Sequence, residues 1–194
     1  TMGCALAVTI GVYASGFLSA AHLNPAVTIA FAVNGSFAWA EVVPYIAGQM
    51  IGAVLGATTV WLAYHEQFEA TKEEGSILGT FATGPQVDSP VWNLMTEIIG
   101  TAVLVVGVMA LGANQISDGL NPMIVGIIVG SIGLSLGGPT GYAINPARDL
   151  GPRIAHAILP ISGKGGSNWG YAWVPIVGPI IGAIVAALVY NLVL

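Results

Sequence analysis

Asn24-Pro25-Ala26 and Asn145-Pro146-Ala147 are two copies of one tripeptide, and each begins a short apolar run. Asparagine is a favoured N-cap and proline is favoured at the first helical position, so each copy predicts the start of a helix. The runs that follow, 25–34 and 146–158, are too short to cross a bilayer, which takes about 20 residues of helix. Two half-length helices in one apolar chain are typical of a site or passage at the membrane midplane.

The composition is that of a membrane protein. Hydrophobic residues make up 55% of the 194 residues and charged residues only 7%, with a mean hydropathy of +0.83. Since a soluble domain carries about 25% charged residues, the sequence predicts an integral membrane protein. A formal net charge of −5 gives no basis for binding nucleic acid. The single cysteine, Cys4, rules out an internal disulfide and a multi-cysteine metal site, and we expect no metal or other cofactor.

Apolar runs organise the chain. The long runs, predicted to be full spans, are 1–18, 42–64, 98–113, 120–137 and 171–194. The third extends back to about Trp92 if Glu97 is tolerated within it. At 1.5 Å per residue, the two short runs after the motifs reach about halfway across a core of about 30 Å. The polar segment 65–90 is predicted to be a solvated loop.

The order of the runs predicts an inverted repeat. Two full spans precede the second motif and one precedes the first, while the segments 48–53 and 178–183 after the motifs resemble each other. Symmetry would be restored if one span lies upstream of Thr1. Because three spans per half is an odd number, the halves then have opposite orientations. The predicted fold is an all-α membrane protein, an inverted 3+3 helix repeat with two half-helices meeting at the midplane, whose first span is missing from this chain.

We therefore expect a single transmembrane channel domain over 1–194. Repeat one covers 1–64 and lacks its first span, a connecting loop covers 65–90, and repeat two covers 91–194. Glycines four residues apart predict close helix packing, since small residues let backbones approach each other in lipid. These glycines are Gly48, Gly52, Gly56, Gly126, Gly130, Gly178 and Gly182.

The motifs have an electrostatic consequence. If the halves are inverted, the N-termini of both half helices face one point, and their partial positive charges oppose the passage of a cation or proton. The amides of Asn24 and Asn145 can still donate hydrogen bonds to a neutral hydroxyl or to water. The segments before the motifs cannot be helical where the chain turns, so their carbonyls form a row of acceptors along the passage. These predicted pore-lining positions are Ala20, Ala21, His22, Leu23, Gly141, Ala143 and Ile144.

The two motifs also carry a resemblance to a known family. Ser19-Ala-Ala-His-Leu-Asn-Pro-Ala-Val-Thr28 and Gly141-Tyr-Ala-Ile-Asn-Pro-Ala-Arg-Asp-Leu-Gly-Pro152 are similar to the two signature loops of the major intrinsic proteins, the aquaporin and glycerol-facilitator family. The resemblance covers the chain from the family's second span to its sixth. It implies a passive channel, not an enzyme, that excludes ions and protons. It also implies a homotetramer in the lipid bilayer of the cell membrane, with one pore per subunit.

Several positions resemble the glycerol-conducting branch of this family rather than the water-selective branch. Asp149 stands where glycerol facilitators carry Asp, and Arg153 is the basic residue typical of them. Pro175-Ile176 stands where water channels prefer two aromatic residues, and the long segment before it also resembles the glycerol branch. The resemblance therefore implies glycerol and similar small neutral solutes as substrates, with water passing too.

The resemblance places the selectivity filter at Cys4, Gly133, Tyr142 and Arg148. Arg148 would hold a pair of solute hydroxyls with its fork of donors and repel cations. Gly133 stands where water channels have His, which predicts a wider constriction, and Tyr142 supplies an aromatic face with an added hydroxyl. Cys4 is small where an aromatic is usual; alternatively the count is off by one or two and Met2 takes this role.

Two acidic residues are expected to support the loops. Glu97 resembles the family's buried glutamate that accepts backbone N–H groups of the second loop. Because an unpaired buried carboxylate is costly, this role is preferred over proton coupling. Asp149 is expected to brace a loop rather than to bind solute, and His22 to buttress the first loop.

Other classes of function make different demands on the sequence. A water-selective channel is disfavoured by Gly133 and Asp149. An ion-coupled secondary transporter can also contain broken helices in inverted repeats, but Glu97 alone is thin support for a coupling ion. An intramembrane enzyme would need a Ser/His/Asp set, a metal-ligand cluster or paired carboxylates at the predicted midplane, and the sequence offers none of these there.

Overall fold

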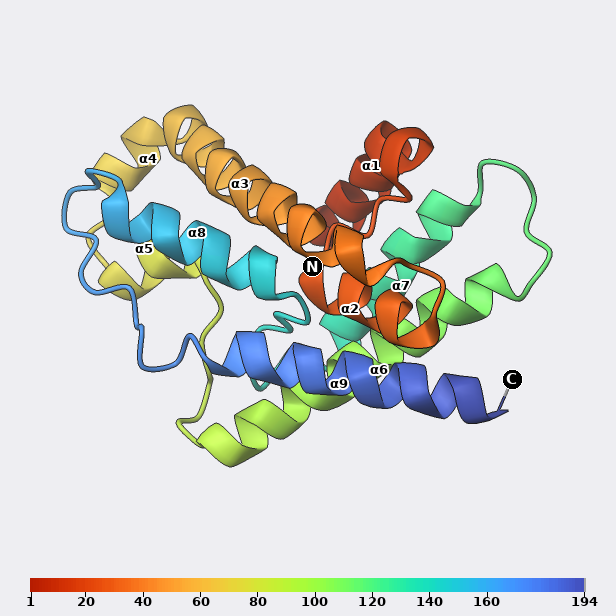
Figure 1. Ribbon diagram of the computed structural model, residues 1–194. Coiled ribbons are helices and arrows are strands. Elements are labelled where there is room, and N and C mark those ends of the chain that lie inside the picture. The colour runs from red at the N-terminus through yellow and green to blue at the C-terminus, as the bar shows by residue number, and fades with distance from the viewer. Residues whose placement is uncertain (194) are drawn as a thin grey trace.

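The computed structural model describes residues 1–193, and every regular element in that range is a helix (Figure 1). In chain order they are α1 (Met2–Ser19), α2 (Pro25–Asn34), α3 (Trp39–Ala63), α4 (His65–Ala70), α5 (Glu74–Phe81), α6 (Pro90–Gly112), α7 (Asn121–Ser135), α8 (Pro146–Ile158) and α9 (Val174–Val193). Four of these, α1, α3, α6 and α9, are long and apolar enough to cross a membrane. The prediction of an all-α membrane protein is confirmed.

The predicted half spans coincide with helices. The runs at 25–34 and 146–158 are α2 and α8, with the same bounds. The full span predicted at 120–137 is shorter in the structure, because α7 has 15 residues. These give about 22 Å of helix against a bilayer core of about 30 Å. The run predicted at 171–194 contains α9, and its last residue, Leu194, lies outside the described residues.

The helices pack in the crossed order that an inverted repeat predicts. The half helix α2 packs against α9, and the half helix α8 packs against α3, so each contacts the last long helix of the other half. In the same bundle α1 packs against α7, and α6 packs against α9. Figure 1 shows α2 and α8 converging on the middle of the molecule. This arrangement brings the two motifs together.

Close helix contacts depend on some of the predicted glycines. A Cβ atom at Gly182 of α9 would lie 2.3 Å from a backbone oxygen of α6, and one at Gly126 of α7 would lie 1.9 Å from a side chain of α1. Both distances are too short for a real Cβ atom. Among the described residues, nothing lies within 4 Å of such an atom at the glycines of α3. The prediction of close packing is therefore confirmed for α7 and α9 but not for α3.

The prediction that 65–90 is a solvated loop is wrong in part. The segment contains α4 and α5, and it buries Phe68, Ile77 and Phe81. Ile77 and Phe81 are four residues apart, which puts them on one face of α5. They pack in a second core with Ala155 of α8. Most charged residues of the segment are exposed, and they conceal the short apolar pattern in the sequence. As a result, the chain that leaves α5 lies directly beside α8.

Candidate functional site

Each motif starts a helix in the way its residues predict. The two asparagines have extended backbones, and the prolines that follow occupy the first helical position. Asn24 Oδ1 accepts a hydrogen bond from the backbone N–H of Ala26 at 2.9 Å. Asn145 Oδ1 accepts from the backbone N–H groups of Ala147 at 3.0 Å and Arg148 at 3.2 Å. These bonds satisfy donors that the start of a helix leaves free.

The same two amides tie the motifs to each other. Asn24 Nδ2 donates to the carbonyl of Ile144 at 2.7 Å, and Asn145 Nδ2 donates to the carbonyl of Leu23 at 2.9 Å. Each carbonyl belongs to the residue immediately before the other motif. An amide nitrogen carries two hydrogens, and one is used in each case. Within residues 1–193 the second hydrogen of each amide has no protein acceptor.

The asparagines of both motifs line one cavity of about 570 Å³. The predicted site residues that line it are Cys4, Ala20, Ala21, His22, Leu23, Asn24, Tyr142, Ala143, Ile144, Asn145 and Arg148. Those that lie outside the lining are Pro25, Ala26, Glu97, Gly133, Gly141, Pro146, Ala147 and Asp149. The remaining wall is mostly apolar and includes Val8, Val27, Leu104 and Val129. The cavity wall therefore combines the polar side chains of Asn24, Asn145 and Arg148 with mostly apolar side chains.

Several residues of the two loops have left-handed backbone conformations. The angle φ is 53° at Ala20, 47° at Ala21 and 52° at Leu23 in the first loop. In the second loop φ is 42° at Tyr142 and 43° at Ile144. Residues with a Cβ atom avoid this region, at a cost of roughly 1–2 kcal/mol each. The loops therefore need contacts from the surrounding bundle to hold their shape.

Glu97 of α6 holds the second loop from behind. Its side chain is 1% exposed. One carboxylate oxygen accepts from the hydroxyl of Thr140 at 2.6 Å and from the backbone N–H of Ala143 at 3.0 Å. The other accepts from the backbone N–H of Ile144 at 2.7 Å. The carboxylate is thus paired with donors of the strained loop and is turned away from the cavity lining.

The side chain of His22 is held by a hydrogen bond to Thr28 and by aromatic neighbours. Thr28 Oγ1 donates its single hydrogen to the carbonyl of Asn24 at 3.0 Å and accepts from Gln49 Nε2 at 3.0 Å. It can therefore only accept from His22 Nδ1, which lies 3.2 Å away. This assigns the proton of the neutral imidazole to Nδ1. Its ring packs among the aromatic side chains of Phe31, Phe37 and Tyr45.

Tyr142 fills the space beside Gly133. A Cβ atom at Gly133 would lie 2.7 Å from Cζ of the tyrosine ring, and one at Gly137 would lie 2.7 Å from its Cδ1. The ring of Tyr142 therefore lies close to Gly133, and a wider constriction at this position stays a prediction. Cys4 lines the cavity, whereas Met2 is 61% exposed and does not line it.

Arg148 lines the cavity at the end where α8 begins. Its Nη1 donates to the carbonyl of Phe81 at 3.4 Å. The next residue, Asp149, is fully buried and accepts from the N–H and from the hydroxyl of Thr83, both at 2.7 Å. Sequence reasoning did not find Thr83 or the Phe81 carbonyl. No local pattern marks them, because their partners lie more than 60 residues away in the sequence.

The model of the major intrinsic protein family matches residues 1–190 of the chain. The chain belongs to the major intrinsic protein family. Members of this family are integral membrane channels, so the predicted family and membrane location are confirmed. Within residues 1–193 no group of three or more His, Cys, Asp or Glu side chains is placed to hold a metal ion.

Similarity to other major intrinsic proteins extends along the whole chain. It is 58% identical over 193 residues to glycerol uptake facilitator protein 3 of Lactiplantibacillus plantarum, covering 100% of this chain and 80% of that protein. It is 57% identical over 189 residues to the glycerol uptake facilitator protein of Bacillus subtilis, covering 97% and 69%. The X-ray structure of the aquaglyceroporin from Plasmodium falciparum matches with a TM-score of 0.87 at 30% identity, covering 99% and 80%. The predicted aquaporin-like fold is thereby confirmed.

Proposed function

We propose that this major intrinsic protein is a passive channel for glycerol and other small neutral solutes, which also passes water and excludes ions and protons. One observation carries the proposal: the same cavity is lined by Asn24 and Asn145, whose amide nitrogens each use one of two hydrogens within the protein, and by mostly apolar side chains. Glycerol carries hydroxyl groups along one edge and C–H groups along the other. It therefore suits a passage with one polar and one apolar side better than a fully polar or fully apolar solute does.

At the filter we assign three roles. Arg148 holds a pair of solute hydroxyls with its fork of donors, and Tyr142 supports the carbon backbone with its ring face. Cys4 leaves room on the opposite wall for a solute larger than water. Behind the filter, Glu97 and Asp149 support the loops and do not bind solute. Gly133 contributes by giving the ring of Tyr142 its place.

Exclusion of cations follows from the charges around the midplane. The N-termini of α2 and α8 each contribute about half a positive charge, and Arg148 adds a full one. A cation that leaves its hydration shell there meets repulsion and no carboxylate on the cavity lining. A neutral hydroxyl meets only donors and acceptors. The names of the relatives, which are glycerol uptake facilitators, support the same solute class.

The working unit in this proposal is one channel domain, with residues 1–64 and 91–194 as its two repeats. We propose that four copies assemble in the lipid bilayer of the cell membrane, each with its own cavity. Exposed apolar side chains on α1 and α7, such as Ile10 and Ile127, supply surfaces for lipid or for a neighbouring copy. Native mass spectrometry of the protein in detergent would give the number of copies directly.

The channel proposal is tested by reconstituting the protein in liposomes and following light scattering after a sucrose or glycerol gradient is imposed. We expect rapid glycerol entry that does not change when a proton or sodium gradient is added. Fast water flow without glycerol entry would instead mean a water-selective channel. Uptake that follows the ion gradient would mean a coupled transporter in which Glu97 takes part.

A further inference from the structure

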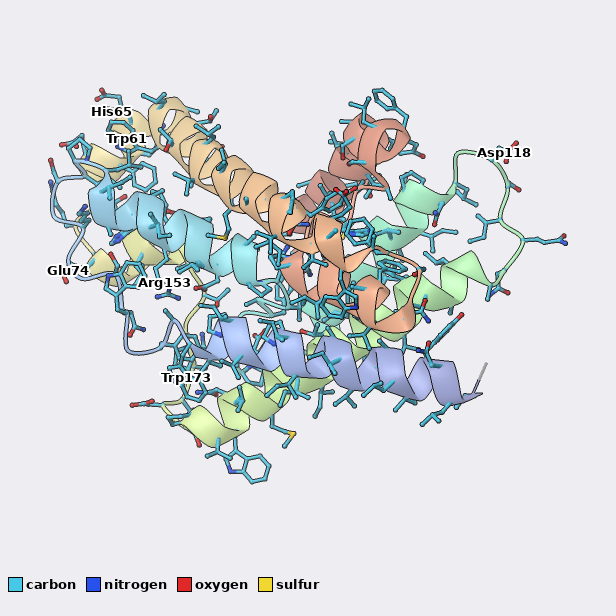
Figure 2. All side chains as sticks on the ribbon, viewed as in Figure 1. Trp61, His65, Glu74, Asp118, Arg153 and Trp173 are labelled. Atoms are coloured by element: carbon cyan, nitrogen blue, oxygen red, sulfur yellow. The ribbon has the colours of Figure 1, made fainter. Side chains whose placement is uncertain are left out.

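The segment 82–86 is the first part of the connection from α5 to α6 and belongs to none of the motifs, yet it is hydrogen-bonded to α8. Thr83 is 6% exposed, and its three backbone and side-chain polar groups all bond to Asp149 or Arg153. Figure 2 shows Arg153 pointing from α8 toward the chain that leaves α5. The segment also bonds to the turn before the second loop, since the N–H of Gln86 donates to the carbonyl of Pro139 at 2.9 Å.

Asp149 and Arg153 form a buried ion pair that binds this segment through hydrogen bonds. Arg153 Nε and Nη2 donate to the two carboxylate oxygens of Asp149 at 2.8 and 2.9 Å. The other hydrogen of Nη2 reaches the carbonyl of Thr83 at 2.9 Å, and Nη1 donates to the carbonyls of Ser167 and Asn168 at 2.8 and 3.0 Å. All five guanidinium hydrogens are therefore used. Because the pair has no net charge, its effect at the filter is to hold the segment in place rather than to change the local charge.

Thr83 connects this pair to the two sides of the filter. Two residues before it, the carbonyl of Phe81 accepts from Arg148 Nη1 at 3.4 Å. This bond lies at the long end of the useful range, so a small shift of the carbonyl would break it. On the other side, a Cβ atom at Gly141 would lie 3.5 Å from Thr83 Cβ and Cγ2, which is ordinary contact distance. Thr83 thus lies near the start of the second pore loop as well.

We propose that Thr83 is a positioning residue of the filter. Its hydroxyl and N–H, held by Asp149, fix the Phe81 carbonyl that orients the Arg148 guanidinium, and so set the opening between Arg148 and Tyr142. The proposal rests on the proposed channel function, and it adds a determinant of solute size that does not line the cavity. Without the Thr83 hydroxyl, the guanidinium can swing aside and admit longer polyols.

The test compares Thr83→Val with the unchanged protein in liposomes, using erythritol and glycerol as solutes. Valine keeps the shape and the backbone N–H but removes the hydroxyl that Asp149 accepts. We expect the ratio of erythritol to glycerol permeability to rise by roughly threefold to tenfold, as when a contact worth part of one hydrogen bond is lost at a barrier. Thr83→Ser keeps the hydroxyl and should retain the original ratio.

Thr80→Val is the matched control, because Thr80 lies three residues earlier, in α5, and its hydroxyl donates only to the carbonyl of Ile77 at 2.8 Å. It should leave the ratio unchanged. A Thr83→Val protein that lowers both permeabilities equally, with the ratio constant, overturns the proposal. The proposal is also overturned if the Thr83→Ser variant reconstitutes but the Thr83→Val variant and the smaller Thr83→Ala variant do not. The hydroxyl would then serve the fold alone.

The same measurements separate this proposal from the channel function. If the unchanged protein passes water but no glycerol, the glycerol proposal fails. The ratio of glycerol to water permeability then reports on Thr83, and its rise in Thr83→Val would still support positioning. If that ratio also stays constant, both proposals are wrong.

Discussion

The two pore loops show how single buried side chains offset strain in a neighbouring backbone. Residues with a Cβ atom adopt left-handed conformations in both loops, which leaves the backbone N–H groups of the second loop pointing away from the cavity. Glu97 collects those N–H groups on its carboxylate. The charge of this residue is therefore used to hold the shape of the loop.

Glu97→Gln tests this account, because glutamine presents one acceptor where three donors converge. Its amide nitrogen would face a backbone N–H or the hydroxyl of Thr140, and a buried donor left without a partner costs about 1–3 kcal/mol. We expect a lower melting temperature in detergent and slower glycerol entry. Thr96→Val is the control, since the Thr96 hydroxyl bonds only to Trp92 of its own helix. Equal melting temperatures for both variants would contradict the account.

The width of the filter can be tested at Cys4. Replacing this small cavity-lining side chain by tryptophan should lower glycerol permeability relative to water by roughly tenfold, because an overpacking cost of about 1.4 kcal/mol corresponds to a factor of ten in rate. Leu6→Trp on the same helix serves as the control, since Leu6 is exposed and lies outside the cavity lining. A Cys4→Trp protein with unchanged selectivity would mean that this wall is not the constriction.

At the scale of elements, the long helices hold the half helices in place through close backbone contacts. Helix α9 packs against both α6 and the half helix α2. The contact of α9 with α6 requires Gly182, where a side chain would meet the backbone of Ile98. The position of α2 in the channel therefore depends on a glycine that is remote from either motif.

Gly182→Ala should destabilise the protein by about 1–3 kcal/mol, because the added methyl group has to push two helix backbones apart. Thermal unfolding in detergent would measure the loss. The same change at Gly79 of α5 meets nothing within 4 Å and replaces a poor helix former by a good one. Gly79→Ala should therefore be neutral or slightly stabilising. If Gly182→Ala unfolds at the original temperature, the α6–α9 contact is looser than its geometry implies.

The molecule as a whole creates the charge barrier, because neither half helix alone supplies it. Each N-terminus contributes about half an elementary charge, so that two meeting end to end present about one. This sum exists only because the crossed packing brings residues more than 100 positions apart into hydrogen-bonding distance, as between Asn24 and Ile144. A channel with one half helix displaced would lose part of its selectivity against cations.

Asn24→Asp should weaken this barrier, since one carboxylate cancels about one positive charge at the meeting point of the helices. We expect liposomes containing this variant to leak potassium at least about tenfold faster than those with the unchanged protein, which would correspond to a barrier lowered by about 1.4 kcal/mol. Asn34→Asp adds the same charge at the other end of α2 and should leave the leak unchanged. A tight Asn24→Asp channel would place the ion barrier elsewhere, with Arg148 as the next candidate.

The sequence determined the class of protein, the long and half-length helices and the two motifs, because apolar length, N-caps and proline positions are local properties. It also placed Glu97 and Asp149 behind the loops through the family resemblance. It did not identify α4 and α5, where a short apolar pattern is masked by charged neighbours. Only the tertiary structure showed that the ring of Tyr142 lies beside Gly133 and that the hydroxyl of Thr83 donates a hydrogen bond to Asp149. The reason is physical: these contacts join segments distant along the chain, and they exist only after the helices have packed.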